Sequence, residues 1–143
     1  MDFPLLLAGP ILRRVESNLV AVWVALSEPA KIKLSVWEDL VVTGKPDPYA
    51  TSDITSTRRI GDKLHLALVT IRVAAGGKSF AAGALYSYDL EFETAQARHT
   101  LATLGMLEDG VANGSRKVAL GLSKNELPSF ATPPDNLADL NLL

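Results

Sequence analysis

LAGPILRRVE (Leu7–Glu16) and VAVWVAL (Val20–Leu26) are the two neighbouring stretches that decide the fold of this 143-residue chain. In the second stretch, Val20, Val22, Val24 and Leu26 fall on one face, and Trp23 falls on the other between two alanines. A period of two with β-branched residues predicts a β-strand. Turn-forming residues bound this strand on both sides, which limits its extent.

Three more segments predict strands. Ala30–Trp37 alternates apolar and polar residues, as half-buried antiparallel strands do. In Leu64–Val73 we expect Leu64, Leu66 and Leu68 to form the core face. Ala84–Phe92 places alternating aromatic and aliphatic residues on one face. Seven or eight strands with frequent turn signals predict an all-β antiparallel sandwich.

Two segments depart from this pattern. Residues 38–61 contain the turn cluster Gly44–Pro48 and predict a loop or short edge strand. Residues 94–108 place Leu101, Leu104, Met106 and Leu107 at roughly helical spacing, which predicts a short inserted helix over about Gln96–Glu108. Lys117–Gly121 and Leu127–Ala131 are candidates for the last strands.

The C-terminal end predicts a domain boundary. We expect residues 1–132 to form the sandwich and residues 133–143 to be a linker with the start of a following domain. Pro133-Pro134-Asp135 is typical of a stiff linker. Asn141-Leu142-Leu143 is apolar without an evident partner, as the first strand of another domain would be.

Composition excludes several classes of protein. The formal charge of −2 and a pI near 5.6 give no basic surface for nucleic acid. Arg13-Arg14 and Arg58-Arg59 are isolated pairs, typical of solvated strand ends. No cysteine is present, which excludes disulfides and thiolate metal sites. The first apolar run, Phe3–Leu12, is too short and too interrupted to span a membrane.

We therefore expect a cytoplasmic protein, with a secreted or periplasmic parent as the alternative. The sequence does not indicate an oligomeric state.

Three patterns suggest chemistry but are better explained as structure. Gly76-Gly77-Lys78-Ser79 lacks the first glycine of a phosphate-binding loop and precedes a strand rather than a helix. His65 and His99 lie far apart in the sequence, and neither has a neighbour at metal-ligand spacing. Gly61-Asp62 is typical of a turn. We therefore predict no catalytic, cofactor-binding or metal-binding residue in this chain.

Two tryptophans are candidates for contact with another domain. Trp23 and Trp37 each lie on the face opposite the aliphatic face of their strand. An exposed tryptophan needs a partner, so these side chains either pack under the predicted helix or meet a partner domain.

The segment Phe80–Tyr86 predicts a tyrosine corner, with Tyr86 as its tyrosine and Tyr88 as the second candidate. In this device a glycine turn, here at Gly83, precedes a tyrosine whose hydroxyl bonds back to the turn. Its role is structural.

Five segments in this order resemble the N-terminal domain of PhoD-like phosphatases, the alkaline phosphatase D family. These segments are Leu7–Glu16, Val20–Leu26, Ser27–Ala30, Gly83–Leu90 and Leu127–Pro134. The resemblance implies an immunoglobulin- or fibronectin type III-like sandwich followed by a calcineurin-like metallophosphoesterase domain. It also implies that divalent metals would lie in that following domain, where they would activate water and bind phosphoryl oxygens.

The resemblance therefore implies a non-catalytic accessory domain that packs against its own C-terminal metallophosphatase domain. The alternative is an independent binding module for a protein or carbohydrate. A small enzyme is the third possibility, and no nucleophile, base or metal cluster in the sequence favours it.

Overall fold

The computed structural model describes residues 2–74, 76–109 and 119–136, and these residues form ten β-strands and no helix. The strands are β1 (Leu6–Glu16), β2 (Leu19–Leu26), β3 (Lys31–Glu38), β4 (Ala50–Thr51), β5 (Thr55–Ser56), β6 (Arg58–Gly61), β7 (Leu64–Arg72), β8 (Leu85–Glu93), β9 (Arg98–Thr100) and β10 (Ser129–Ala131). The all-β prediction is confirmed.

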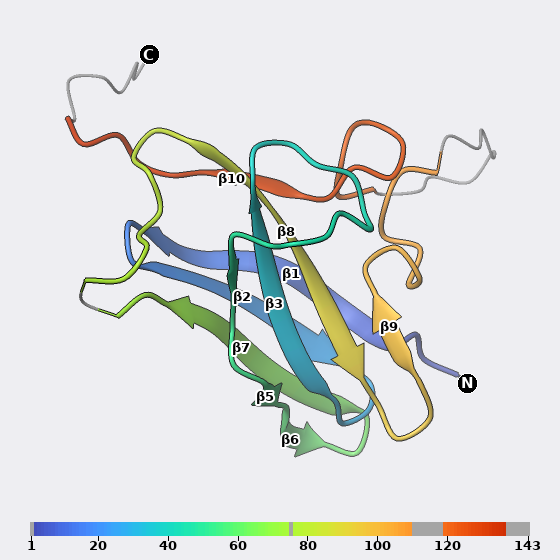
Figure 1. The fold of residues 1–143 in the computed structure, drawn as a ribbon. Helices are drawn as coiled ribbons and strands as arrows, with labels where there is room; N and C mark the ends of the chain where they lie inside the picture. The colour runs from blue at the N-terminus through green and yellow to red at the C-terminus, as the bar shows by residue number, and fades with distance from the viewer. Residues whose placement is uncertain (1, 75, 110–118, 137–143) are drawn as a thin grey trace, which may run out of the picture.

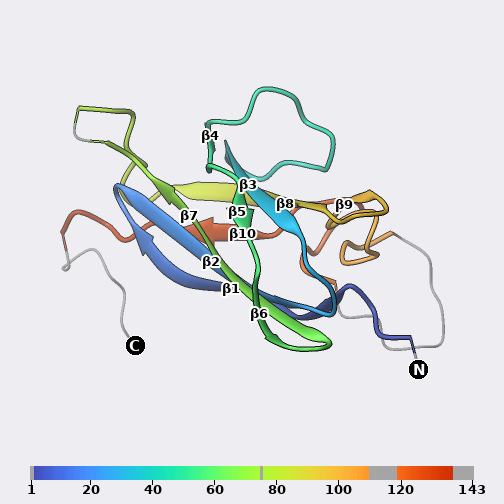
Figure 2. The same cartoon turned by 90° about the horizontal axis from the view of Figure 1, so that it is seen from below.

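The strands make two antiparallel sheets that face each other (Figures 1 and 2). One has four strands in the order β1-β2-β7-β6. The other has six strands and the order β10-β8-β3-β4, with β5 also paired to β3 and β9 to β8. Strands that follow one another in the chain therefore often lie in different sheets.

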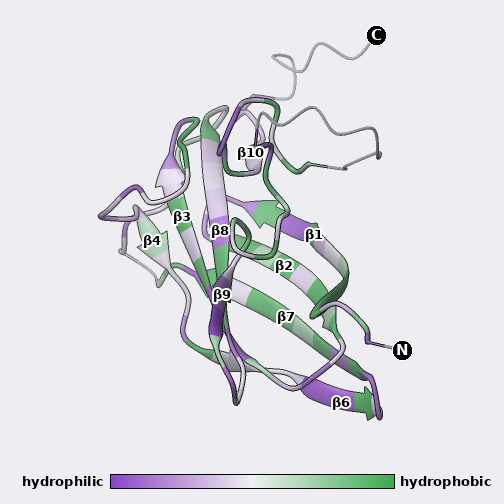
Figure 3. Ribbon diagram, turned by 90° about the vertical axis from the view of Figure 1, so that its right-hand side faces the viewer, coloured by the Kyte–Doolittle hydropathy of each residue, from purple (hydrophilic) through white to green (hydrophobic). Residues whose placement is uncertain are grey.

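The core lies between the sheets and is built from alternate residues of the long strands. The aliphatic faces predicted for Val20–Leu26, Ala30–Trp37 and Ala84–Phe92 all point into it. Their fully enclosed side chains are Val20, Val22, Val24, Leu26, Ile32, Leu34, Val36, Leu90 and Phe92. Figure 3 shows β2 and β7 as largely hydrophobic and β9 as hydrophilic. Burial of one face of each sheet is the main source of stability in such a fold.

The inner face of β7 is the reverse of the one predicted. Val69 and Ile71 are buried, while Leu64 and Leu68 are exposed. The register with β2 explains the difference, because Val22 pairs with Val69 and both point inward. The leucines consequently share the outer face with Trp23.

The predicted helix between residues 94 and 108 is wrong. Residues Arg98–Thr100 form β9 against β8, and a single helical turn follows. Gly105, with a φ of 74°, ends this turn: Met106 N–H donates to Leu101 O and Gly105 N–H donates to Ala102 O, each at 3.0 Å. This pair of bonds is the Schellman arrangement that terminates helices.

The predicted last strand is present as β10, within Leu127–Ala131. Of the other candidate, Lys117–Gly121, residues 117 and 118 lie outside the described residues and residues 119–121 are not in a strand. Asn113-Gly114, a pair that favours tight turns, also lies outside them. Short edge strands β4, β5 and β6 occupy the second half of residues 38–61, as expected.

Strand β1 bends across a close approach to β2 at Gly9. Its φ is 92°, in the left-handed region, and the Gly9–Pro10 peptide is cis. A Cβ at this position would lie 2.7 Å from the backbone oxygen of Trp23. The register of the β1–β2 pair also shifts across this residue, between Ala8 and Ile11. Only glycine satisfies both the backbone angle and the contact.

Gly9→Ala is expected to lower the free energy of unfolding by about 2–4 kcal/mol, because it adds a backbone clash to left-handed strain. Urea denaturation followed by circular dichroism measures the change. Gly44→Ala is the matched control, since Gly44 has a φ of 87° but a Cβ added there would meet no atom within 4 Å. It is expected to cost about 1 kcal/mol. Equal losses for the two variants would contradict the close-approach explanation.

Candidate functional site

Tyr86 joins the start of β8 to the turn that precedes it. Its ring is buried, and its hydroxyl oxygen accepts a hydrogen bond from the Ala81 N–H at 2.7 Å. Gly83, with a φ of 62°, lets the chain reverse between these residues. This geometry is that of a tyrosine corner, which fixes the connection between two sheets.

The same turn holds the segment that leaves the sandwich. The Thr132 hydroxyl donates to Ala81 O at 2.5 Å and accepts from Ala84 N–H at 2.9 Å. Gly83 N–H donates to Pro133 O at 3.1 Å. Thr132 is only 5% exposed. The exit segment is therefore fixed to the body of the domain.

An aromatic cluster lies beneath this junction. Phe80 meets Tyr86 edge-to-face with ring centroids 5.2 Å apart, and Phe130 of β10 stacks on Tyr86 at 5.7 Å. Tyr49, from the loop before β4, contacts Tyr86 at 5.6 Å. Such pairs are worth about 0.5–1.5 kcal/mol each beyond their buried area. The turn, the exit and the loop before β4 thus share one packing unit.

Trp37 is covered by its own chain. It is only 9% exposed, and its indole N–H donates to Pro46 O at 3.2 Å. A hollow of about 220 Å³ remains beside it, also lined by Lys45, Tyr49 and Lys78. Little of this indole is available to another domain.

The Gly76–Ser79 turn packs against the loop before β4. Lys78 Nζ lies 3.9 Å from the centroid of the Tyr49 ring, a cation–π contact. The Tyr49 hydroxyl donates to Ser79 O at 2.5 Å. Burial, together with Tyr86 and Glu38, raises the pKa of Tyr49. Phe80 continues toward Gly83 without a helix.

Trp23 lies on the outer face of the four-stranded sheet and is half-buried. It is directly opposite Ile11 of β1 and Leu68 of β7, so these three side chains make one row across three strands. Ile11 and Leu68 are 44% and 51% exposed. Trp23 and Trp37 therefore lie on different sheets and are not brought together.

The other sequence candidates are also dispersed. His65 is buried on the inner face of β7, whereas His99 lies on β9 of the other sheet. Asp62 follows Gly61 in the turn after β6 and pairs with Arg59. Among the described residues, no group of three or more histidines, aspartates or glutamates is placed to hold a metal ion. The same part of the chain has no helix long and apolar enough to cross a bilayer.

Asp89 is a titratable group that no sequence pattern singles out. It lies on the outer face of β8, and its Oδ1 accepts hydrogen bonds from Leu90 N–H at 2.8 Å and Leu101 N–H at 3.3 Å. Burial raises the pKa of Asp89 to about 6, and the two backbone donors oppose this rise. Leu101, which covers it, is fully buried. No local pattern indicates this, because the cover comes from the turn after β9.

Tyr86→Phe is expected to lower the free energy of unfolding by about 1–2 kcal/mol, because the Ala81 N–H loses its acceptor in a partly buried hydrogen bond. Urea denaturation measures the loss. Tyr88→Phe is the matched control: Tyr88 is equally buried on the same strand, and burial raises its pKa to about 12. Its hydroxyl has no hydrogen bond to another described residue. A larger loss for Tyr88→Phe would show that the corner depends on Tyr88.

Asp89 is expected to make the domain more stable as the pH falls from about 7.5 to 5. Its folded pKa of about 6 lies above the ordinary 3.8, so the folded state takes up the proton at a higher pH than the unfolded state does. The charged carboxylate, which predominates above pH 6, destabilises the fold. Asp89→Asn keeps an oxygen acceptor and removes this component, of order 1–2 kcal/mol. The measurement is the urea midpoint of both proteins against pH. Parallel pH profiles would contradict the assignment.

No family model matches the sequence, and neither the curated proteins nor the solved structures contain a match to it.

Proposed function

We propose that this chain is the non-catalytic N-terminal domain of a PhoD-like metallophosphatase, packed in the whole protein against a metallophosphoesterase domain that carries the metals and the chemistry. The resemblance of five ordered sequence segments suggests the family. The geometry supports the domain's role independently of that resemblance, through its strand order and its exit.

The observation that carries the proposal is the strand order. Immunoglobulin-like domains place their strands A, B, E and D in one sheet and C, F and G in the other. The strands β1-β2-β7-β6, in their order across one sheet, correspond to A-B-E-D. The strands β10-β8-β3, in their order across the other sheet, correspond to G-F-C. The tyrosine corner at Tyr86 lies at the start of the strand that corresponds to F, where such domains carry it. This strand order supports the immunoglobulin-like sandwich that the resemblance implies.

The fixed exit supports the accessory role. A domain that only shares a chain with its neighbour needs no ordered connection, and flexible linkers are common between such domains. Here Phe130 is buried, Thr132 bonds to Ala81 and Ala84 through its hydroxyl and its backbone N–H, and Pro133 O accepts from Gly83 N–H. A following domain would therefore start from a defined position and direction.

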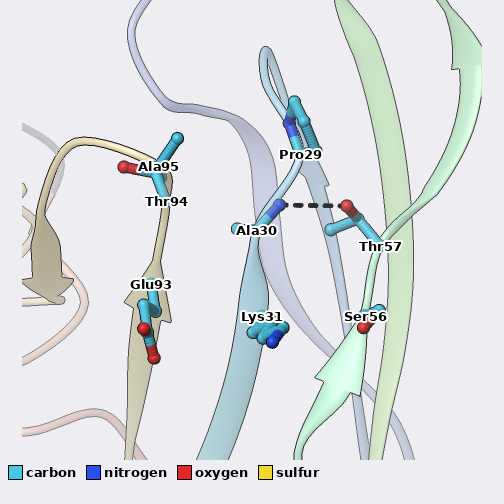
Figure 4. A pocket seen from close by; sticks show the side chains of 8 residues that line it. All are labelled: Pro29, Ala30, Lys31, Ser56, Thr57, Glu93, Thr94 and Ala95. Atoms are coloured by element: carbon cyan, nitrogen blue, oxygen red, sulfur yellow. Dashed lines mark hydrogen bonds between the residues drawn. The ribbon is translucent and has the colours of Figure 1, made fainter.

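The second candidate is an independent binding module, which one hollow favours. A space of about 410 Å³ opens beside the start of β3, between β5 and the β8–β9 turn (Figure 4). Lys31, Ser56, Thr57 and Glu93 line it with polar groups suited to a hydroxylated ligand. It lacks the aromatic platform typical of sugar sites, so the accessory role is preferred.

The purified 143-residue chain is expected to hydrolyse neither phosphate monoesters nor diesters, with or without added iron, calcium, manganese or zinc. The same chain extended through its downstream coding sequence is expected to be a metal-dependent phosphatase that a chelator inactivates. Release of 4-nitrophenol from chromogenic mono- and diesters measures both.

Metal-dependent turnover by the 143-residue chain would overturn the proposal. So would a coding sequence that ends at Leu143, or an extended protein with no hydrolase activity. Either of the last two results would favour the binding module.

A further inference from the structure

We infer that the outer face of the four-stranded sheet is the docking surface of this domain, and that its occupant is an apolar patch of the following catalytic domain, rimmed by carboxylates. The inference rests on the function proposed above. It adds which of the two sheet faces docks and what chemistry the facing surface has.

The first observation is an apolar row without a cover. Ile11, Trp23 and Leu68 stand side by side across β1, β2 and β7. Next to them Ile60 of β6 is 58% exposed. A hollow of about 340 Å³ opens between Trp23, Ile60 and Leu68, wide enough to receive an apolar side chain. Contiguous exposed apolar surface of this kind marks interaction sites on soluble domains.

The second observation is the charge around this row. Arg58 is directly opposite Leu66 and lines the same hollow, and Arg72 lies on the same face of β7 as Leu68. Within the described residues, neither arginine forms an ion pair. Arg14 lies opposite Ala21 and is already paired with Glu16 at 2.8 Å. The rim of the face is therefore positive, and a complementary surface is acidic.

Because this rim is positive, binding of a second copy of this chain to the face is unfavourable. A twofold dimer would place the same face against itself. Arg58 and Arg72 of one copy would then meet a surface whose free charges have the same sign, which is unfavourable.

The other sheet has no comparable face among its described residues. Along its outer surface Lys31 is opposite Glu93 and Lys33 is opposite Glu91, and Arg98 lies 3.6 Å from both glutamates. The turn after β9 covers the part near Asp89, and the loop before β4 covers Trp37. Its charges are balanced and its tryptophan is covered by the chain itself. Leu85 of β8 is 47% exposed, but its partner on β10 is Ala131 rather than another large apolar residue.

The test uses a single cysteine, because the 143-residue sequence has none of its own. Leu68→Cys is placed in the 143-residue chain and in the chain extended through its downstream domain, and alkylation of that peptide is followed by mass spectrometry. Lys33→Cys, on the outer face of the other sheet, is the matched control. Leu68→Cys is expected to react at least tenfold more slowly in the extended protein, while Lys33→Cys reacts equally in both.

A second set of variants tests the charge complementarity. In the extended Leu68→Cys protein, the double charge reversal Arg58→Glu with Arg72→Glu is expected to restore most of the lost alkylation rate. Reversal of Lys33 to Glu is the control and is expected to leave that rate unchanged.

Two outcomes overturn the inference. Equal alkylation of Leu68→Cys in both proteins would show that this face does not dock. Protection that appears in the 143-residue chain and grows with its concentration would show that a second copy is the occupant. Phosphatase activity of the extended protein is measured on the same samples. An active phosphatase with an unprotected Leu68→Cys would refute the docking face and leave the proposed function standing.

Discussion

The structure depends on the contact between two strand faces. The inner face of β2 is buried against the six-stranded sheet, and the inner face of β3 is buried against the four-stranded sheet. Side chains alternate strictly along a strand, so a slip of one residue would exchange every buried residue for an outward one. In β2 that exchange would expose Val20, Val22, Val24 and Leu26, all fully enclosed. This cost fixes β2, and hydrogen bonding to β2 then fixes β1 and β7. The row of Ile11, Trp23 and Leu68 on the opposite face is a direct result.

Much of the fold could be predicted from the sequence because its central strands alternate clearly between apolar and polar or between branched and small residues. The exception is β7, which is apolar on both faces, so its pattern does not say which face is buried. Its pairing with β2 determines which face is buried, and that pairing joins segments that lie far apart in the sequence. The helix predicted after β8 is wrong for another reason. The helical spacing of its leucines is a true local signal, but Gly105 ends the helix after one turn, and the Leu101 N–H donates to Asp89.

The residues of the candidate site also divide into those that the local sequence predicts and those that it does not. Tyr86 and Gly83 could be identified because a tyrosine corner is encoded within a few neighbouring residues. The partner of that corner in the exit, Thr132, bonds to residues far from it in the chain, and nothing near Thr132 indicates this. Asp89 and the arginine-rimmed row are also products of strand pairing. Residues that act through local geometry could therefore be predicted, and those that act through assembly of the sheets could not.

In the two-domain protein proposed above, the fixed exit would change how strongly the docking face needs to bind. A domain that starts at a defined point beside the sandwich meets this face as an intramolecular partner, at an effective concentration of order millimolar. A patch with only millimolar intrinsic affinity would then be occupied much of the time within one chain, and would bind almost nothing when the two domains are separate molecules. In that protein, attachment through Thr132 would allow a small face to bind its own neighbour selectively, without binding other proteins.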